Sequence, residues 1–309
     1  MLSRTGLFSA PGVVDARHLA YAPQYPLWTD GAAKARWIHL PPGTAIDGRD
    51  EDGWVFPVGT KVWKEFSFHG RKVETRFLWK TGRRAWVFAS YAWNGDQTDA
   101  VLVSGEGRSH AALAGPDAWH DIPSRADCRA CHGQERVEVL GFSALQLSPD
   151  RDPGAIHGEA LQPGMITLRD LVARNLLRNA RQDLLDRPPR IPADTPATRS
   201  ALGYLDANCA SCHRSDRPIP GLDLDFRHTS RITREADEPG LRTTRLRVAR
   251  PGAPARLQPG APDRSLLLHR MSSRRPSSQM PPLGTVLVDQ PAVDHLSRWI
   301  ASLPATPTP

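Results

Sequence analysis

Apolar and polar residues alternate with a period of two over residues 54–102, and this pattern predicts an antiparallel β-domain. Many of the alternating side chains are aromatic or β-branched, the types that are enriched in strands. The alternating sets are Trp54, Phe56 and Val58; Val73, Thr75, Phe77 and Trp79; and Trp86, Phe88 and Ser90. Gly59, Gly70 and Gly82 lie between the runs, where tight turns favour a residue that tolerates positive φ.

Four helices are predicted in the second half of the chain, where the apolar spacing changes to three or four residues. The residues that can cap their N-termini are Thr167, Thr195, Ser265 and Asp289. The helix from Thr195 leads directly into Cys209. Residues 216–262 show little periodicity and are predicted to form an extended loop.

These patterns predict an α+β fold with an N-terminal antiparallel β-domain and a C-terminal all-α domain. The predicted parts are an irregular segment at 1–50, the β-domain at 51–135, a loop, helix and Pro-rich linker at 136–192, the all-α domain at 193–304 and a disordered tail at 305–309. The run of Arg and Pro residues at 187–192 places the linker.

The chemistry is carried by two Cys-x-x-Cys-His motifs, which use all four cysteines of the 309-residue chain. The first consists of Cys128, Cys131 and His132, and the second of Cys209, Cys212 and His213. Two thiols three positions apart can add to the two vinyl groups of a haem, and the next imidazole can then bind the iron. The motifs therefore predict two covalently bound haem c groups, with His132 and His213 as iron ligands.

Other interpretations of paired cysteines fit the sequence less well. Two Cys pairs can form a structural zinc site, but they are then typically separated by about 15–20 residues, whereas Cys131 and Cys209 are much farther apart. A thioredoxin-like redox motif requires a βαβ context that the pattern lacks. A disulfide between residues so close in sequence would stabilise the fold little.

A sixth iron ligand can be predicted for the second haem. Met280 lies in a Pro-rich loop between the last two predicted helices, and a methionine thioether is a common axial ligand. Met271 is the alternative, although its place at the end of an apolar helix favours core packing.

The sixth ligand of the first haem is left open by the sequence. Met165 and then His157 are the first candidates, and His110 and His120 also lie within reach along the chain. An open sixth position would instead allow a small molecule to bind the iron.

The C-terminal part, residues 195–303, resembles a class I cytochrome c domain, on the positions Cys209, Cys212, His213 and Met280. That resemblance implies that the first and last helices of this part cross beside the haem. The long Arg-rich insertion at 216–262 departs from the family pattern.

The whole chain is similar to a family of bacterial dihaem c-type cytochromes of uncharacterised function. The segments that carry this similarity are 25–31 (YPLWTDG), 56–60 (FPVGT), 63–66 (WKEF), 122–128 (IPSRADC) and 280–285 (MPPLGT). The similarity implies an exported, periplasmic or outer-surface protein, and it supplies no substrate.

A third resemblance covers residues 50–133. A β-rich domain that ends in a haem motif is similar to hydroxylamine-oxidising cytochromes whose haem is crosslinked to a lysine. This resemblance implies that the first haem packs against the sheet, and it points to Lys64 as the corresponding lysine. An exposed strand pair of Lys64 and Glu65 is the alternative explanation.

The formal net charge of +7 at pH 7 is compatible with a solvated, Arg-rich surface or with an acidic redox partner protein. No helix-turn-helix or zinc-finger spacing is visible, so nucleic acid is not expected as a partner. No window approaches the ~18 apolar residues of a membrane span. No signal peptide is readable at the N-terminus, although c-type haem is attached outside the cytoplasm in bacteria.

The leading prediction is an electron-transfer protein in which the second haem exchanges electrons with a partner and the first relays them. The alternative is a redox enzyme that acts on a small molecule, such as peroxide or hydroxylamine, at an open first haem. A third possibility is a binding module in which the β-domain holds a carbohydrate or a protein. No catalytic base stands out among the Asp, Glu and His residues.

Overall fold

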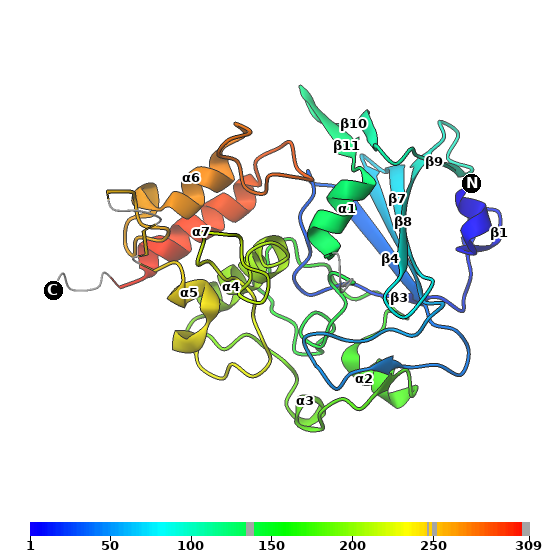
Figure 1. The fold of residues 1–309 in the computed structure, drawn as a ribbon, viewed down its shortest axis with the longest axis horizontal. Coiled ribbons are helices and arrows are strands. Elements are labelled where there is room, and N and C mark those ends of the chain that lie inside the picture. Colours follow the sequence, from blue (N-terminus) through cyan, green and yellow to red (C-terminus); the bar gives the residue numbers. More distant parts are fainter. Residues whose placement is uncertain (134–138, 246, 249–251, 305–309) are drawn as a thin grey trace. The chain divides into compact units, whose positions relative to one another are not determined.

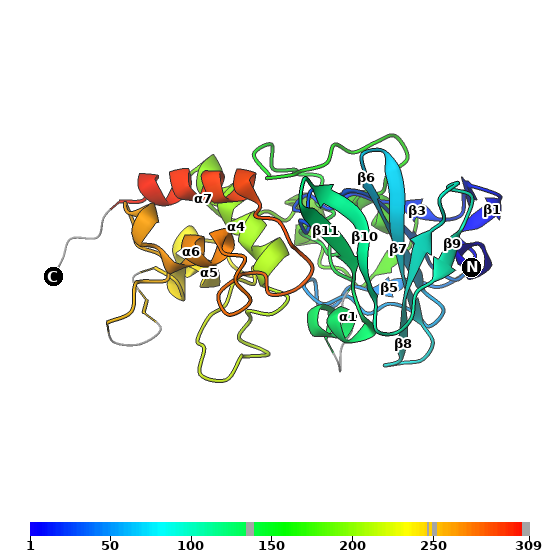
Figure 2. The same ribbon diagram turned by 90° about the horizontal axis from the view of Figure 1, so that it is seen from above.

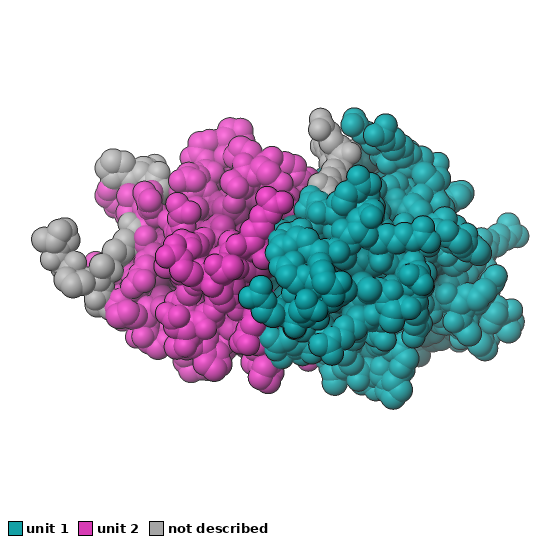
Figure 3. Space-filling model, turned by 90° about the horizontal axis from the view of Figure 1, so that it is seen from below, with its two compact units in different colours: residues 1–24, 29–151, 159–189 teal, residues 25–28, 152–158, 190–309 magenta. Residues whose placement is uncertain are grey.

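The computed structural model of the protein describes residues 1–133, 139–245, 247–248 and 252–304. The predicted tail at 305–309 lies outside the described residues. The chain forms two compact units (Figure 3): unit 1 holds residues 1–24, 29–151 and 159–189, and unit 2 holds residues 25–28, 152–158 and the chain from Arg190 onward. Unit 1 is built mainly of strands and unit 2 mainly of helices, which confirms the α+β prediction.

The centre of unit 1 is a six-stranded antiparallel sheet with the order β3-β4-β6-β7-β8-β9 (Figure 1). Its strands are β3 (Leu19–Ala20), β4 (Ala33–His39), β6 (Lys61–Phe68), β7 (Arg71–Lys80), β8 (Trp86–Trp93) and β9 (Ala100–Leu102). Strands β6, β7 and β8 confirm the alternation seen in the sequence. Gly70, with a φ of 76°, sits in the tight turn between β6 and β7.

The two faces of this sheet differ. One face packs Trp63 and Phe77 against Leu2 and Leu7 of the N-terminal segment. That segment contains η1 (Leu2–Thr5), β1 (Phe8–Ala10) and β2 (Val13–Val14). The other face, called here the motif face because α1 packs on it, carries the apolar residues Ile38, Val62, Leu78 and Phe88 of a second core cluster.

The motif face is covered by segments that follow the sheet in sequence. They are β10 (Arg108–Gly115), β11 (Ala118–Ile122), α1 (Arg125–His132), α2 (Leu168–Ala173), β12 (Leu177–Arg178) and α3 (Asp183–Asp186). Strand β12 pairs in parallel with β5 (Ile46–Asp47). Thr167 and Asp170 form the predicted capping box at the start of α2.

Three features of unit 1 differ from the sequence prediction. The segment 1–50 is not irregular, because it contains β4, which lies inside the sheet. Residues 54–58 alternate but form no strand; Trp54 and Phe56 enter the core from a loop instead. The hairpin of β10 and β11 lies within the predicted β-domain at 51–135 but beyond the stretch of alternation at 54–102.

The segment predicted as loop, helix and linker contributes to the core of unit 1. Phe142, Leu147, Leu168 and Leu171 are all buried in the cluster below the motif face. Such burial stabilises a fold through the hydrophobic effect. The division from unit 2 falls between Pro189 and Arg190, inside the Pro-rich run that marked the predicted linker.

Unit 2 is built around helices α4 (Pro196–Cys209) and α7 (Gln290–Ser302), which contact each other (Figure 2). The shorter elements are η2 (Glu235–Asp237), α5 (Pro239–Arg242), η3 (Pro262–Arg264) and α6 (Leu266–Ser272). Thr195 and Asp289 cap α4 and α7 with their side chains as predicted, whereas Ser265 precedes α6 without a side-chain cap. The segment 216–262, predicted as a loop, contains η2 and α5.

The core of unit 2 lies between α4 and α7. Leu205, Leu296 and Ile300 are buried there, and the indole of Trp299 donates a hydrogen bond to Thr198 Oγ1 at 3.1 Å. Within the part of the chain that the structure describes, no helix is both long enough and apolar enough to cross a membrane.

Candidate haem-binding sites

The first motif lies on helix α1, which begins at a capping box. Ser124 accepts a hydrogen bond from the backbone N–H of Asp127 at 3.1 Å, and the Asp127 side chain accepts one from the backbone N–H of Ser124 at 2.9 Å. This reciprocal cap fixes the start of the helix. Cys128 and Cys131 therefore lie about one turn apart, and His132 is the last residue of the helix.

Helix α1 packs against strand β8 of the sheet (Figure 2). The ring of His132 lies 5.6 Å from that of Phe88, centroid to centroid, on the motif face. Cys128 packs at the edge of the apolar cluster on the same face, and this burial raises the pKa of its thiol, although Arg76 opposes the rise. The motif thus faces an apolar and aromatic surface of the kind that a porphyrin needs.

Two histidines proposed as sixth ligands of the first haem have other partners in unit 1. His120 is buried, with Nε2 3.0 Å from Glu74 Oε1 and Nδ1 3.4 Å from Asp30 Oδ2. His110 is exposed, and its ring packs against that of Trp119 at 5.6 Å. Both ring nitrogens of His120 are engaged, so this side chain is a buried structural histidine.

The two leading candidates are separated by the fold. His157 belongs to unit 2, where its Nε2 lies 2.8 Å from Asp289 Oδ1. Met165 belongs to unit 1 and is half-buried, and its sulfur accepts a hydrogen bond from the backbone N–H of Gln162 at 3.4 Å. Met165 thus remains a prediction, whereas His157 lies in the unit that carries the second motif.

The second motif begins where helix α4 ends. Cys209 is the last residue of α4, and the following turn brings the backbone N–H of Cys212 to 3.1 Å and that of His213 to 2.9 Å from the Cys209 carbonyl oxygen. Burial raises the pKa of the Cys209 thiol to about 12. A thiol in such a setting is not a reactive thiolate, which argues against a thioredoxin-like role.

His213 is held in an apolar and cationic environment. Its ring packs edge-on against Phe226, with centroids 6.0 Å apart and an interplanar angle of 81°. Its Nδ1 is buried and has no hydrogen-bond partner among the described residues. Burial lowers the pKa of His213, and Arg256 and Arg270 lower it further. The imidazole is therefore kept neutral, the form that binds metals.

Met280 lies in the loop between α6 and α7, as the sequence predicts. It is half-buried, and its backbone N–H donates to the carbonyl oxygen of Arg270 at 3.0 Å. Met271 is 6% exposed on helix α6, which fits the core-packing role that was its expected alternative. The chemistry of the second site, two thiols, a neutral imidazole and a thioether on one helical unit, fits a c-type haem.

Neither Cys pair takes part in a disulfide bond or in a metal-binding cluster among the described residues. The two pairs belong to different compact units. All four cysteines are among the described residues, and none forms a disulfide bond. Among the described residues, no group of three or more His, Cys, Asp or Glu side chains is arranged to hold a metal ion.

Four cationic residues on the motif face were not recognised as a cluster from the sequence, although Lys64 was singled out by resemblance. Lys34 and Arg36 project from β4, Lys64 from β6 and Arg76 from β7, and the strand register places all four on one face. The sequence does show that Lys34 and Arg36 are two positions apart, as residues on one face of a strand are, but strands are normally recognised from the alternation of apolar residues. Lys64, the lysine indicated by resemblance, thus faces the same side of the sheet as the first motif; a crosslink remains a prediction.

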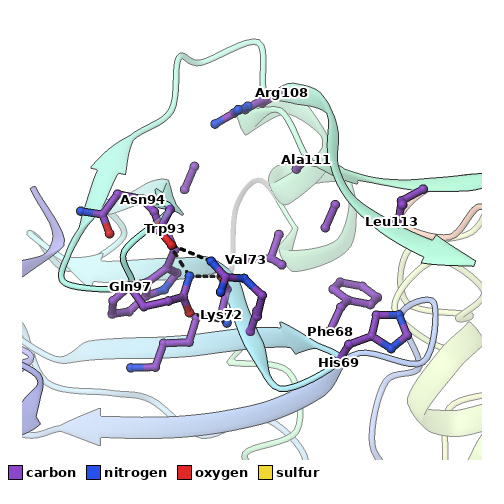
Figure 4. Close-up of a pocket in the computed structure, with 14 residues that line it drawn as sticks. Phe68, His69, Lys72, Val73, Trp93, Asn94, Gln97, Arg108, Ala111 and Leu113 are labelled. Carbon is purple, nitrogen blue, oxygen red and sulfur yellow. Dashed lines mark hydrogen bonds between the residues drawn. The ribbon is translucent and has the colours of Figure 1, made fainter.

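A separate pocket of about 300 Å³ lies between the β7–β8 strands and β10 (Figure 4). Its wall includes Phe68, Val73 and Leu113, and Gln97 closes one side by exchanging hydrogen bonds with the backbone of Lys72 at 2.8 and 3.1 Å. None of the predicted haem-binding residues lines it.

Comparison of the chain with models of protein families, with curated proteins and with solved structures found no significant match. The resemblances stated from sequence motifs therefore stay predictions, and the functional argument rests on the residues themselves.

Proposed function

We propose that the protein is a dihaem c-type cytochrome that transfers electrons through two covalently attached haems. One observation carries this proposal: each of two compact units holds a Cys-x-x-Cys-His motif at the end of a helix, with the imidazole against an aromatic ring. His132 packs on Phe88 and His213 on Phe226. Zinc, disulfide and thioredoxin-like interpretations lack comparable support in the described residues.

The haem supplies the redox chemistry, and the polypeptide supplies attachment, ligation and environment. In unit 1, Cys128 and Cys131 would hold the porphyrin and His132 its iron. In unit 2, Cys209, Cys212 and His213 would do the same. The apolar cluster and Phe88 exclude water on one side, and Arg256 and Arg270 keep His213 in its neutral form. Met280 is the proposed sixth ligand in unit 2, where a thioether raises the reduction potential.

Electron transfer is the favoured role because neither motif has an obvious catalytic base beside it among the residues that the structure describes. The excess of cations, +7 at pH 7, suits an acidic redox partner. Since haem is attached to such motifs outside the bacterial cytoplasm, we place the mature protein in the periplasm or at the cell exterior as part of the same proposal.

The proposal is tested by haem counting on the full chain, produced with an export signal in a bacterium that matures c-type cytochromes. A pyridine haemochrome assay and the intact mass should report two covalently bound haems. The paired variants C128S/C131S and C209S/C212S should each retain one. Bare polypeptide in the mature wild-type protein would refute the proposal.

A redox enzyme is the second candidate, and one specific observation favours it. Of the four residues considered as sixth ligands of the first haem, His120 has both ring nitrogens beside carboxylates, and the Nε2 of His157 lies beside Asp289. An open first iron would be high-spin when ferric and would bind cyanide rapidly. Electron paramagnetic resonance with cyanide titration therefore separates the two roles, because a transfer protein should show two low-spin haems.

A further inference from the structure

Three cations surround one phenyl ring on the motif face of the sheet. The ammonium of Lys64 lies 4.9 Å from the ring centroid of Phe66, that of Lys34 lies 5.9 Å away, and the guanidinium carbon of Arg76 lies 4.2 Å away. A phenyl face attracts cations, but it cannot neutralise three of them. The cluster therefore gathers positive charge in one small region.

The strand register brings these cations directly opposite one another. Arg36 on β4 faces Lys64 on β6, and Lys64 in turn faces Arg76 on β7. Like charges directly opposite across strands destabilise a sheet. A row of three cations across three central strands is therefore unfavourable unless an anion lies over it.

The carboxylates near the cluster are hydrogen-bonded to the arginines and the histidine, and Glu159 also acts electrostatically on both lysines. Arg36 makes two hydrogen bonds to Glu159, at 2.7 and 2.9 Å. Arg76 bonds to Glu74, which also contacts His120, and Asp30 contacts the other side of the His120 ring. These contacts fix the two arginines and leave the two lysines without a carboxylate partner.

Lys34 and Lys64 make no ion pair among the described residues. The Lys34 ammonium donates to the carbonyl oxygen of Ala32 at 3.1 Å. Among the described residues, the contact recorded for the Lys64 ammonium is with the Phe66 ring. A buried charge is costly unless it is paired, so both ammonium groups lack the partner that their position requires.

Both lysines are half-exposed but surrounded by protein atoms. Burial lowers the pKa of Lys34 to about 8 and that of Lys64 well below its ordinary value, and neighbouring cations lower both further. The cluster of Lys34, Arg36, Lys64 and Arg76 is called here the cradle.

The cradle lies beside the first haem motif. Burial lowers the pKa of Arg76, but Glu74 and then Cys128 and Cys131 raise it, so the guanidinium is within electrostatic reach of both thiols. Across the sheet, β8 contacts α1, and β7, β6 and β4 follow in order with Arg76, Lys64 and Lys34. The cations therefore extend away from the cysteines along the motif face.

The positions of the substituents on the haem determine where its negative charges lie. The vinyl-derived edge, which bonds to the two cysteines, lies opposite the edge that bears two propionates. A haem bonded to Cys128 and Cys131 would carry its propionates on the edge away from these cysteines, and the cations lie on the same face of the sheet as α1. The two ammonium groups equal the two carboxylates in number and carry the opposite charge.

We propose that Lys34 and Lys64, flanked by Arg36 and Arg76, bind the two propionates of the haem attached at Cys128 and Cys131. This inference rests on the proposed function, because it requires a haem at the first motif. Charge-assisted hydrogen bonds from the ammonium groups to the propionates would neutralise the cradle.

The test is a redox titration of the haem-loaded, full-length K34Q/K64Q variant, in which the visible spectrum reports the reduction of each haem. A nearby cation stabilises the reduced haem, so its removal should lower the reduction potential of one haem and leave the other unchanged. We expect the equilibrium constant for reduction of that haem to fall about tenfold, which corresponds to about 59 mV for a one-electron couple. K34R/K64R, which keeps both charges, should stay close to the wild type.

The matched control is K61Q, which removes one cation from the same strand but from the opposite face. Lys61 donates to the carbonyl oxygen of Thr5 at 2.8 Å, away from the cluster. Its variant should leave both potentials unchanged. Equal potentials in K34Q/K64Q and in the wild type would overturn the inference.

Two further outcomes would also overturn it. If inorganic phosphate shifts the spectrum of the wild-type haem protein and this response is lost in K34Q/K64Q, the cradle binds a free anion and not the propionates. If K64Q alone converts a low-spin haem to high-spin, Lys64 is an iron ligand. A mature protein without covalent haem refutes the proposed function itself, whereas two intact haems with unchanged potentials refute only the propionate site.

Discussion

Helix α4 and the segment at 25–28 meet at a contact that allows a sharp prediction for unit 2. A Cβ atom at Gly203 would lie 2.1 Å from Cε1 and 2.4 Å from Cδ1 of the Tyr25 ring. Tyr25 is 2% exposed, and its hydroxyl donates to Asp152 at 3.0 Å. The ring therefore has little freedom to move aside when Gly203 is replaced by alanine.

Two opposing effects set the magnitude for Gly203→Ala. In an unobstructed helix interior, alanine stabilises relative to glycine by about 1 kcal/mol. Overpacking a buried site costs about 1–3 kcal/mol, and an approach of 2.1 Å belongs at the upper end of that range. We therefore expect a net loss of about 2 kcal/mol in the unfolding free energy of unit 2.

The same substitution should change sign when the ring is absent. In a Tyr25→Ala background the added methyl group has room, so Gly203→Ala should stabilise by up to about 1 kcal/mol. The coupling between the two sites should then be about 3 kcal/mol in a double-mutant cycle.

The assay is urea unfolding of the four proteins, followed by far-ultraviolet ellipticity at the helix band, because the helices lie mainly in unit 2. An equal cost of Gly203→Ala in both backgrounds would refute the reasoning. It would mean that the Tyr25 ring does not occupy the space beside α4.

Three other predictions follow from the described residues. Burial raises the pKa of Asp206 to about 6, so the folded state holds this proton more tightly than the unfolded chain, and the unfolding free energy should fall as pH rises from about 4 to about 6, by at most about 1.4 kcal/mol per pH unit. The variant Asp206→Asn, whose side-chain oxygen can still accept from the backbone N–H of His228, should lose that part of the pH dependence. A difference in stability between the wild type and this variant that does not change with pH would contradict the prediction. Leu171→Ala should lower the unfolding free energy of unit 1 by about 2–5 kcal/mol in thermal or urea unfolding, because Leu171 is fully buried in its core. A loss near zero would mean that this segment acts as a linker and not as part of the core. Met280→Ala should lower the reduction potential of one haem and remove its methionine-ligation band, and an unchanged spectrum would exclude Met280 as a ligand.

Helices α2, α4 and α7 were predictable because their start signals are local, whereas α1, α3 and α5 were not predicted. Thr167, Thr195 and Asp289 each accept a backbone hydrogen bond at the N-terminus of the predicted helix. Such caps act within a few residues, so no knowledge of the rest of the fold is needed to recognise them. The two haem motifs were recognisable for the same reason, since their chemistry depends on residues that are adjacent in sequence.

The apolar loop at 54–58 shows the opposite case. Trp54 and Phe56 alternate with less buried neighbours like residues of a strand, and both are buried in the core of unit 1. Alternation reports which side chains are buried, but a ladder of hydrogen bonds also needs a neighbouring strand. Only an isolated bridge, between Val55 and Asp47, forms here. The pattern was therefore right about the burial of Trp54 and Phe56, wrong about that of Val58, which is 53% exposed, and wrong about secondary structure.

Strand β4 was missed because it places Lys34 and Arg36 on the motif face, at positions where an ordinary strand would carry apolar residues. Local rules fail most often at sites that serve a function rather than the stability of the fold. Lys34 lies opposite Phe66 and Arg36 lies opposite Lys64 on β6, so the cations come together only through the strand register. Sequence reasoning could find each cation but not the cluster.

The cation cluster also connects the stability of unit 1 with its cofactor. In the row Arg36, Lys64 and Arg76, the carboxylates of Glu159 and Glu74 offset the two arginines, whereas Lys64 forms no ion pair among the described residues. A ligand that binds only the folded state stabilises that state, and a covalently attached haem cannot dissociate. If its propionates bind the cradle, attachment at Cys128 and Cys131 would give Lys64 an anionic partner and stabilise the folded sheet. The charge pattern that hides β4 from sequence analysis would then be the same pattern that holds the haem.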